Sequence, residues 1–276
     1  MVGPASLNSS HRNQSMVARF VLLSCALLAL AAQVQAQGVE YSDGTTRYRV
    51  STTTSGSQTT PLGSSKFELG VQQRITLNVA HQTKDTLMAT VTLDSISLTG
   101  AAAIADVSTL QGAKFVSLVS PTGRVYSSKA PTSSDPVTSQ LAEGIARFLP
   151  AYHPNLHPGA TWADTSTGKV MQQGMELDRT VVSNFTVEGD TTIGGLRAFK
   201  VARVTSVKAA GSGKPQGTPI SMESSSRSNG AFYVSTTGVF LGATSVDDVN
   251  LKLKILAQGA EISLQQNAQT RIEPIQ

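Results

Sequence analysis

The chain has 276 residues, of which 39% are hydrophobic, 14% charged and 5% aromatic, and its formal net charge is +4. The charged share lies well below the roughly 25% of an average soluble domain. Such a chain is too apolar for a charge-driven disordered tail and too poor in Lys and Arg for an obvious nucleic-acid binder. A single Cys excludes a disulfide framework and a Cys-based zinc site.

Residues 16–36 have the layout of a secretory signal peptide. Arg19 supplies a positive start, an apolar run covers residues 20–32, and Ala36 places a small residue at the cleavage position. The run is shorter than the roughly 20 residues that a membrane span needs, although a retained anchor is the alternative. We expect translation from Met16, removal of residues 1–36, and a periplasmic or extracellular protein without a transmembrane span.

The only Cys, Cys25, lies inside this leader, where residues 22–25 loosely resemble a bacterial lipobox. Lipidation is therefore an alternative, but the apolar run continues past Cys25. Removing residues 1–36 from the 276 leaves 240 residues, and it removes Arg12 and Arg19, so the net charge falls from +4 to +2. A chain of this size buries roughly 70% of its surface, which lets residues 37–276 form a single domain without disulfides.

The first half of this domain has a sequence pattern that is typical of β-strands. Apolar residues alternate with polar ones over residues 69–79, and again over residues 87–93 after a polar turn at residues 81–85. After Asp94 and Ser95 the apolar phase shifts, which predicts a β-bulge or bend. A second hairpin is expected over residues 114–128, because Pro121 and Gly123 suit a tight turn.

The second half repeats these patterns. Strands are expected over the following segments: residues 177–187, 198–207, 231–235, 239–245, 252–255 and 261–264. The Gly-, Pro- and Ser-rich residues 209–219 predict a mobile loop.

One amphipathic helix is expected near residues 136–149. Asp135 can cap it, Pro136 suits its first position, and Pro150 ends it. Its apolar stripe recurs at helical spacing, at Val137, Leu141, Ile145 and Phe148. Glu143 and Arg147 can pair on another face. We therefore predict a mainly β fold, in which a curved antiparallel sheet packs around this central helix.

The two halves have similar landmarks, which suggests a duplicated β-unit. A Gly-Thr-Thr-Arg-Tyr segment begins at Gly44 and a Gly-Ala-Thr-Trp segment begins at Gly159. Later, Thr122-Gly123 and Thr237-Gly238 occupy matching turns. Pseudo-repeats over residues 38–130 and 159–275 would then be joined by the helix at residues 136–149. Chance similarity among Ser/Thr-rich strands is the alternative.

The helix, the sequence Phe148-Leu149-Pro150, and the later Pro158-Gly159-Ala160-Thr161-Trp162 resemble a bacterial family of exported β-rich proteins of unknown function. The resemblance would span most of residues 38–275, although its motifs are short. It implies export and a β-rich fold, and it transfers no catalytic residue. The architecture is also similar to that of periplasmic lipoprotein carriers, a likeness of fold alone.

Three aromatic residues near the Pro-rich link are candidates for lining an apolar groove: Phe148, Tyr152 and Trp162. Aromatic side chains give a large contact area at low entropic cost. The alternative is that they only complete the core at the end of the sheet.

His153 and His157 are four residues apart, a spacing that would favour a metal on a helix, but Pro154 and Pro158 forbid that helix. An extended pair could still bind Zn or Cu if Asp164 joined it. These three residues are weak metal candidates, and no cofactor is expected.

The sequence thus favours an exported, non-catalytic protein that binds an apolar or amphiphilic ligand, such as a lipid, or an envelope protein, and no nucleic acid. One alternative is a metal-dependent or hydrolytic enzyme that uses the loop of His153 and His157. Another is a structural or adhesive surface module, suggested by Thr-rich strands such as residues 51–54.

Overall fold

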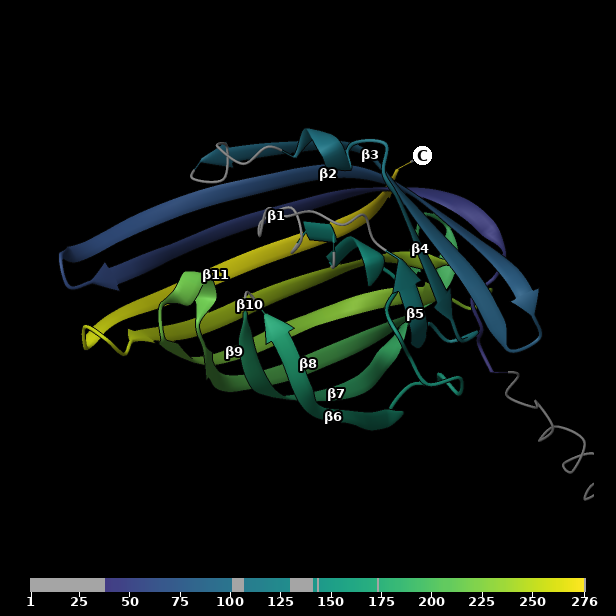
Figure 1. The fold of residues 1–276 in the computed structure, drawn as a ribbon. Coiled ribbons are helices and arrows are strands. Elements are labelled where there is room, and N and C mark those ends of the chain that lie inside the picture. The colour runs from purple at the N-terminus through teal and green to yellow at the C-terminus, as the bar shows by residue number, and fades with distance from the viewer. Residues whose placement is uncertain (1–37, 101–106, 130–140, 143, 173, 276) are drawn as a thin grey trace, which may run out of the picture. The chain divides into compact units, whose positions relative to one another are not determined.

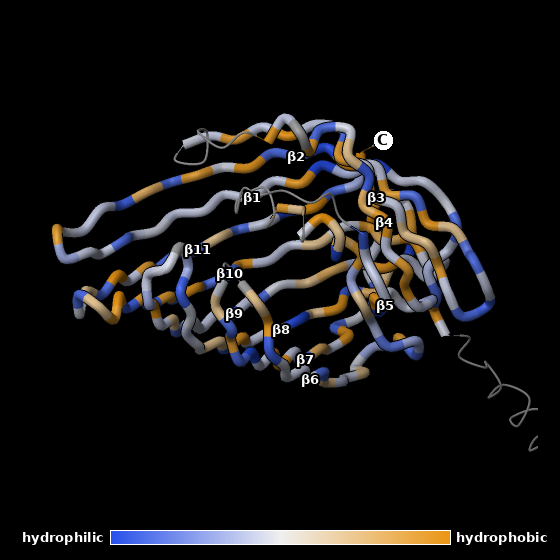
Figure 2. Tube along the Cα trace, viewed as in Figure 1, coloured by the Kyte–Doolittle hydropathy of each residue, from blue (hydrophilic) through white to orange (hydrophobic). Residues whose placement is uncertain are grey.

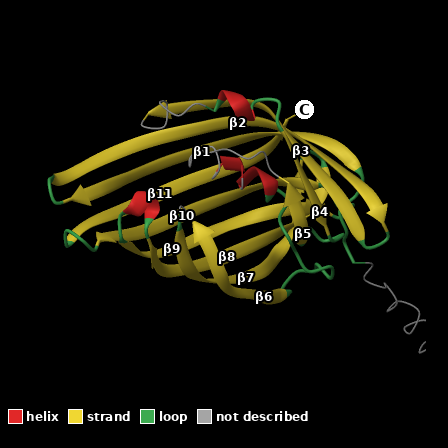
Figure 3. Ribbon diagram, in the orientation of Figure 1, coloured by secondary structure: helices red, strands yellow, loops and turns green. Residues whose placement is uncertain are grey.

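The computed structural model describes residues 38–100, 107–129, 141–142, 144–172 and 174–275. The leader, residues 136–140 and Glu143 of the expected helix lie outside these ranges. The described strands form one antiparallel sheet that curves around a hollow face (Figures 1 and 3). They are β1 (Gly44–Thr60), β2 (Gly63–Thr83), β3 (Thr86–Gly100), β4 (Lys114–Val119), β5 (Val125–Lys129), β6 (Thr161–Gln172), β7 (Met175–Ile193), β8 (Leu196–Gly213), β9 (Ile220–Ser235), β10 (Phe240–Ile255) and β11 (Ala260–Ile275). Two short 3₁₀ turns are η2 (Ser108–Leu110) and η3 (Pro215–Gly217).

The strand order is β5-β4-β3-β2-β1-β11-β10-β9-β8-β7-β6. Strands that are consecutive in sequence are therefore paired, except for β5 and β6, and β1 also pairs with β11 in the middle of the sheet. The outermost described strands, β5 and β6, do not pair with each other, so this sheet is not closed. The chain from β5 to β6 consequently has to cross from one edge of the sheet to the other.

The described part of this crossing segment packs on the hollow, concave face. Residues 141–142 and 144–146 are helical (Figure 3). The segment then tightens, because Arg147 N–H donates to Gly144 O (3.3 Å) and Phe148 N–H to Ile145 O (3.1 Å). The described helix therefore ends at Ala146, three residues before the expected end at Leu149, since Pro150 disfavours helix just before it. The expected pairing of Glu143 with Arg147 falls outside the described residues.

The mainly β, antiparallel and curved character of the fold is confirmed. The bulge expected after Asp94 is also present, because Arg74 faces Ser95 while the next residue, Ile75, already faces Leu93. The loop expected at residues 209–219 is wrong over its first part. There β8 continues to Gly213, because β7 and β9 pair with it on both sides and supply the hydrogen bonds that the local composition does not favour.

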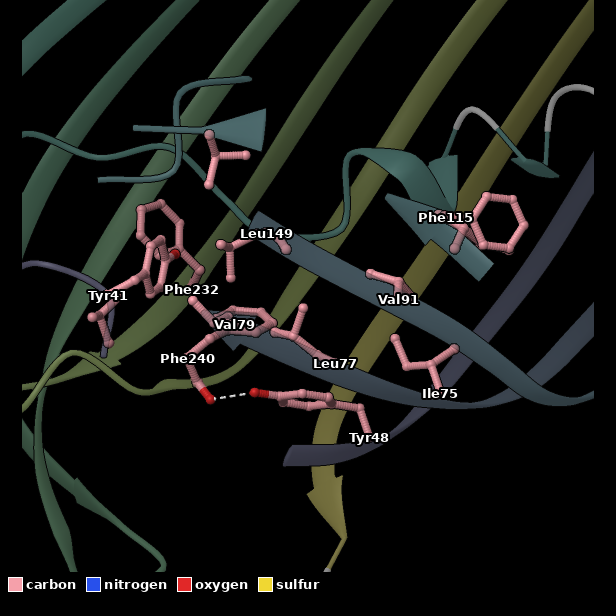
Figure 4. Packing of buried hydrophobic residues seen from close by; sticks show 14 of the residues in the cluster. Tyr41, Tyr48, Ile75, Leu77, Val79, Val91, Phe115, Leu149, Phe232 and Phe240 are labelled. Atoms are coloured by element: carbon pink, nitrogen blue, oxygen red, sulfur yellow. Dashed lines mark hydrogen bonds between the residues drawn. The ribbon is translucent and has the colours of Figure 1, made fainter. Parts of the chain in front are cut away.

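The main core packs side chains of several strands, such as Ile75 and Phe232, against Leu149 of the crossing segment (Figure 4). Tyr48, Ile75, Leu87 and Phe115 are each at most 1% exposed. The Tyr48 hydroxyl donates to Phe240 O at 2.7 Å, so the buried phenol is satisfied. Along the strands, hydrophobic positions alternate with polar ones (Figure 2), as expected for strands with one buried face.

The residues just before β1 are hydrogen-bonded to two turns of the sheet. In the turn after β4, Gly123 N–H donates to Ser120 O (2.9 Å), and in the turn after β9, Gly238 N–H donates to Ser235 O (3.0 Å). Tyr41 N–H then donates to Pro121 O (2.7 Å) and Ser42 N–H to Gly238 O (3.0 Å). The entering segment is thus bonded to a turn from each half. The duplication suggested by the sequence stays a prediction.

Candidate functional site

A cavity of about 330 Å³ lies between the crossing segment and the middle of the concave face. Leu141, Ile145 and Phe148 line it from the crossing segment. Its apolar lining from the sheet comes from seven residues on five strands: Val50, Ile75, Ala231, Phe232, Phe240, Ala243 and Ile272. The cavity is therefore walled mainly by hydrophobic and aromatic groups, as small-molecule sites commonly are.

The pairing register explains why these side chains converge. Residues directly opposite one another on antiparallel strands project from the same face of a sheet. Phe232 faces Ala243, Ala243 faces Ile272, and the row continues through Val50 to Gln73 on β2. One row across five strands therefore ends, within the cavity, on a polar side chain.

Gln73 is 8% exposed and lines the cavity. Its side chain has no hydrogen-bond partner among the residues that the structure describes. The amide is not sealed off from the cavity space, because Tyr152 Oη is the only fully enclosed side-chain polar atom without a hydrogen-bond partner among the described residues. Gln73 therefore offers a free donor and a free acceptor to whatever occupies the cavity.

The next row along the strands is polar and contains a cation. Arg203 on β8 faces Gly230, Gly230 faces Ser245, and Ser245 faces Thr270. Arg203, Ser245 and Thr270 line the cavity. Burial lowers the pKa of the Arg203 guanidinium, and the negative charge of Asp247 partly offsets this effect. The guanidinium stays cationic at neutral pH because arginine does not lose its proton in proteins.

Phe148 closes the apolar part of the cavity. Its ring meets Tyr48 edge-on at 5.2 Å and Phe240 edge-on at 5.5 Å, measured between ring centroids. Such edge-to-face pairs are favourable beyond the area that they bury. They fix the crossing segment against β1 and β10.

The structure does not bring the three groove candidates together in this cavity. Phe148 lines it, whereas Tyr152 is 5% exposed and packs edge-on against Tyr41 at 4.9 Å. Burial raises the pKa of the Tyr152 phenol. Trp162 stacks on Phe185 with centroids 4.9 Å apart, at the β6–β7 pair. All three pack on the main core cluster.

The weak metal candidates occupy separate surroundings. Asn155 N–H donates to His153 Nδ1 (3.3 Å), while His157 Nδ1 lies 3.2 Å from Pro158 O. Asp164 lies on β6. Within the described ranges, no group of three or more His, Cys, Asp or Glu side chains is placed to hold a metal ion.

Sequence reasoning missed Gln73 and Arg203. The sequence did contain a sign of both, because each is a polar residue at a strand position where the alternation otherwise places an apolar residue. Gln73 stands between Val71 and Ile75, and Arg203 follows Val201 at the spacing of inward-facing residues. A polar residue at a core-facing position indicates a function or a specific partner.

No helix in the described part of the chain is long and apolar enough to span a membrane.

The sequence matches no protein-family model and no curated protein. Several solved structures are distantly similar. Neisserial surface protein A shares 11% identity over 83% of this chain and 99% of its own, with a TM-score of 0.14. A DUF1329 family protein from Desulfovibrio piger shares 7% over 81% and 85%, with a TM-score of 0.18. A domain from Vibrio parahaemolyticus, proposed to be an outer membrane lipoprotein-sorting protein, shares 9% over 79% and 83%, with a TM-score of 0.16.

Proposed function

We propose that this chain is an exported, non-catalytic protein that binds an apolar or amphiphilic ligand in the concave cavity. Export rests on the leader pattern of residues 16–36. The observation that carries the binding proposal is the cavity itself, an apolar space of about 330 Å³ roofed by Ile145 and Phe148.

The energetics of such a site are favourable for alkyl or aromatic groups. Each buried CH₂ group contributes about 0.8 kcal/mol. The volume lies within the roughly 300–1,000 Å³ of common ligand pockets. The unpartnered amide of Gln73 adds a polar contact at one wall, which suits an amphiphile better than a pure hydrocarbon.

The test is binding of phenylnaphthylamine, a neutral dye that fluoresces in apolar surroundings. The variant Ala243→Phe fills the cavity and should weaken dye binding roughly ten-fold or more. Ala210→Phe is the matched control, because Ala210 is exposed on β8 and does not line the cavity. Thermal melting of each variant verifies folding.

Equal dye binding by Ala243→Phe and the unmodified protein, or no dye binding by either, would refute the proposal. The enzyme alternative on His153 and His157 stays a hypothesis, which metal analysis of the isolated protein addresses.

The sheet edges support a second candidate, a structural or adhesive module. All five residues of β5, Val125–Lys129, are exposed, and β6 pairs only with β7 among the described strands. Unpaired strand edges are templates onto which another chain can add a strand.

A further inference from the structure

We propose that the occupant of the cavity is a single-chain amphiphile with an anionic headgroup, and that Arg203 holds this headgroup. This inference rests on the proposed binding function and specifies its ligand class. It is carried by an unpartnered guanidinium, an unpartnered amide and the absence of acidic side chains from the described lining.

Arg203 has no ion pair and no side-chain hydrogen bond to any residue that the structure describes. The nearby carboxylate of Asp247 instead accepts a hydrogen bond from Ser245 Oγ at 2.9 Å. The guanidinium, which can donate five N–H groups, therefore lines the cavity without a hydrogen-bond partner among the described residues. A partly buried cation in this condition is stabilised when an anion binds to it.

Arg203 and Ser245 both line the cavity, in the polar row next to the apolar one. Gly230 lies between them on β9, and a Cβ there would lie 2.3 Å from Thr244 O, so β9 and β10 approach closely at this point. A carboxylate or phosphate group in the cavity can accept bonds from the guanidinium, whereas the Ser245 hydroxyl already donates its proton to Asp247.

The charge of the lining favours an anion. Arg147, which is exposed, and Arg203 are its two charged side chains, and no Asp or Glu belongs to the described lining. Arg147 projects from the crossing segment and Arg203 from the sheet, so the two cations come from opposite walls. A cationic headgroup would meet like charge from each wall.

The apolar row fixes where the alkyl chain lies. Phe232, Ala243 and Ile272 form the row next to Arg203 and lie beneath Ile145 and Phe148. An alkyl chain along this row keeps its headgroup at Arg203, while Gln73 is at the far end of the same row. The volume of about 330 Å³ is at the lower end of common pockets, which favours one chain over two.

The experiment is displacement of phenylnaphthylamine by amphiphiles with the same dodecyl chain and different headgroups. Dodecanoate and dodecyl phosphate are the anionic probes, dodecyl maltoside is the neutral probe, and dodecyltrimethylammonium is the cationic probe. We expect an anionic probe to displace the dye most strongly and the cationic probe most weakly. The two anionic probes distinguish a carboxylate ligand from a phosphate ligand.

Arg203→Gln should weaken the anionic probe roughly ten- to hundred-fold, the range of a charged hydrogen bond, and leave the neutral probe unchanged. Arg203→Lys should restore part of the preference, because it keeps the charge and loses the planar fork. The control is Arg227→Gln, which removes one positive charge from an exposed site outside the cavity. Dye binding by each variant verifies that its cavity is intact.

Dye binding with no headgroup preference, or a preference that survives Arg203→Gln, would overturn this inference and leave the proposed function standing. Failure of the unmodified protein to bind the dye would remove the proposed function and this inference together.

Discussion

At the scale of single residues, the position of a side chain in the sheet decides its contribution more than its type does. Leu87 on β3 is completely buried, whereas Leu62, at the tip of the β1–β2 hairpin, is completely exposed. Both are leucines, but Leu87 belongs to the apolar alternation of a strand, whereas Leu62 lies in the turn between two strands. Gln73 and Arg203 make the same point, because their inward positions turn ordinary polar residues into candidate ligand contacts.

Leu87→Ala should lower the free energy of unfolding by about 2–5 kcal/mol, because it removes buried methyl groups and leaves a cavity. Leu62→Ala is the matched control and should change it by less than about 0.5 kcal/mol. Urea titration followed by circular dichroism measures both values. Similar losses for the two variants would contradict the assignment of the core.

At the scale of elements, tight turns join the entering chain to the sheet. Gly238 has φ +80°, and a Cβ there would lie 1.8 Å from Glu40 O. The positive φ and the close approach both require glycine at this turn. The segment before β1 is thus tied to the β9–β10 turn through its backbone.

Gly238→Ala should destabilise the protein by more than the about 1–2 kcal/mol that a left-handed conformation costs a non-glycine residue. Gly195→Ala is the control, because Gly195 has φ +81° and nothing lies within 4 Å of its Cβ position. The difference between the two melting temperatures reports the contact with Glu40. Equal shifts would show that this contact does not matter.

At the scale of the whole molecule, pairing of the first and last strands organises the described sheet. Because β1 and β11 pair at the centre of the sheet, the two consecutive strands that do not pair are β5 and β6, which lie at opposite edges. The described part of the connection between them packs on the concave face and roofs the cavity. The candidate site is therefore a consequence of strand order.

Hydrogen exchange followed by mass spectrometry should show the slowest amide exchange in β1, β10 and β11. These strands are bonded on both sides, whereas β5 is bonded only to β4 and is exposed along its length. Local opening of an edge strand requires much less free energy than opening of the centre. Exchange in β11 as fast as in β5 would contradict the central pairing.

The sequence by itself predicted a mainly β chain and the alternation of apolar and polar residues along many of its strands, because alternation of period two is a local property of each strand. It did not predict β6, and it did not single out the inward-facing Gln73 and Arg203. It did place the bulge near Asp94, and Leu141 and Ile145 on a helical segment, whereas Phe148 lies beyond the described end of that helix. The Gly- and Ser-rich composition of residues 209–213 predicted a loop, and this was wrong. Pairing with β7 and β9 on both sides keeps these residues in β8.

Only the tertiary structure decided that β1 pairs with β11, that the crossing segment covers the concave face, and that Gln73 and Arg203 reach one cavity with Phe148. Gln73 and Arg203 are far apart in sequence and come together through the register of several strand pairs. Each register depends on hydrogen bonds between distant segments, which local patterns do not encode.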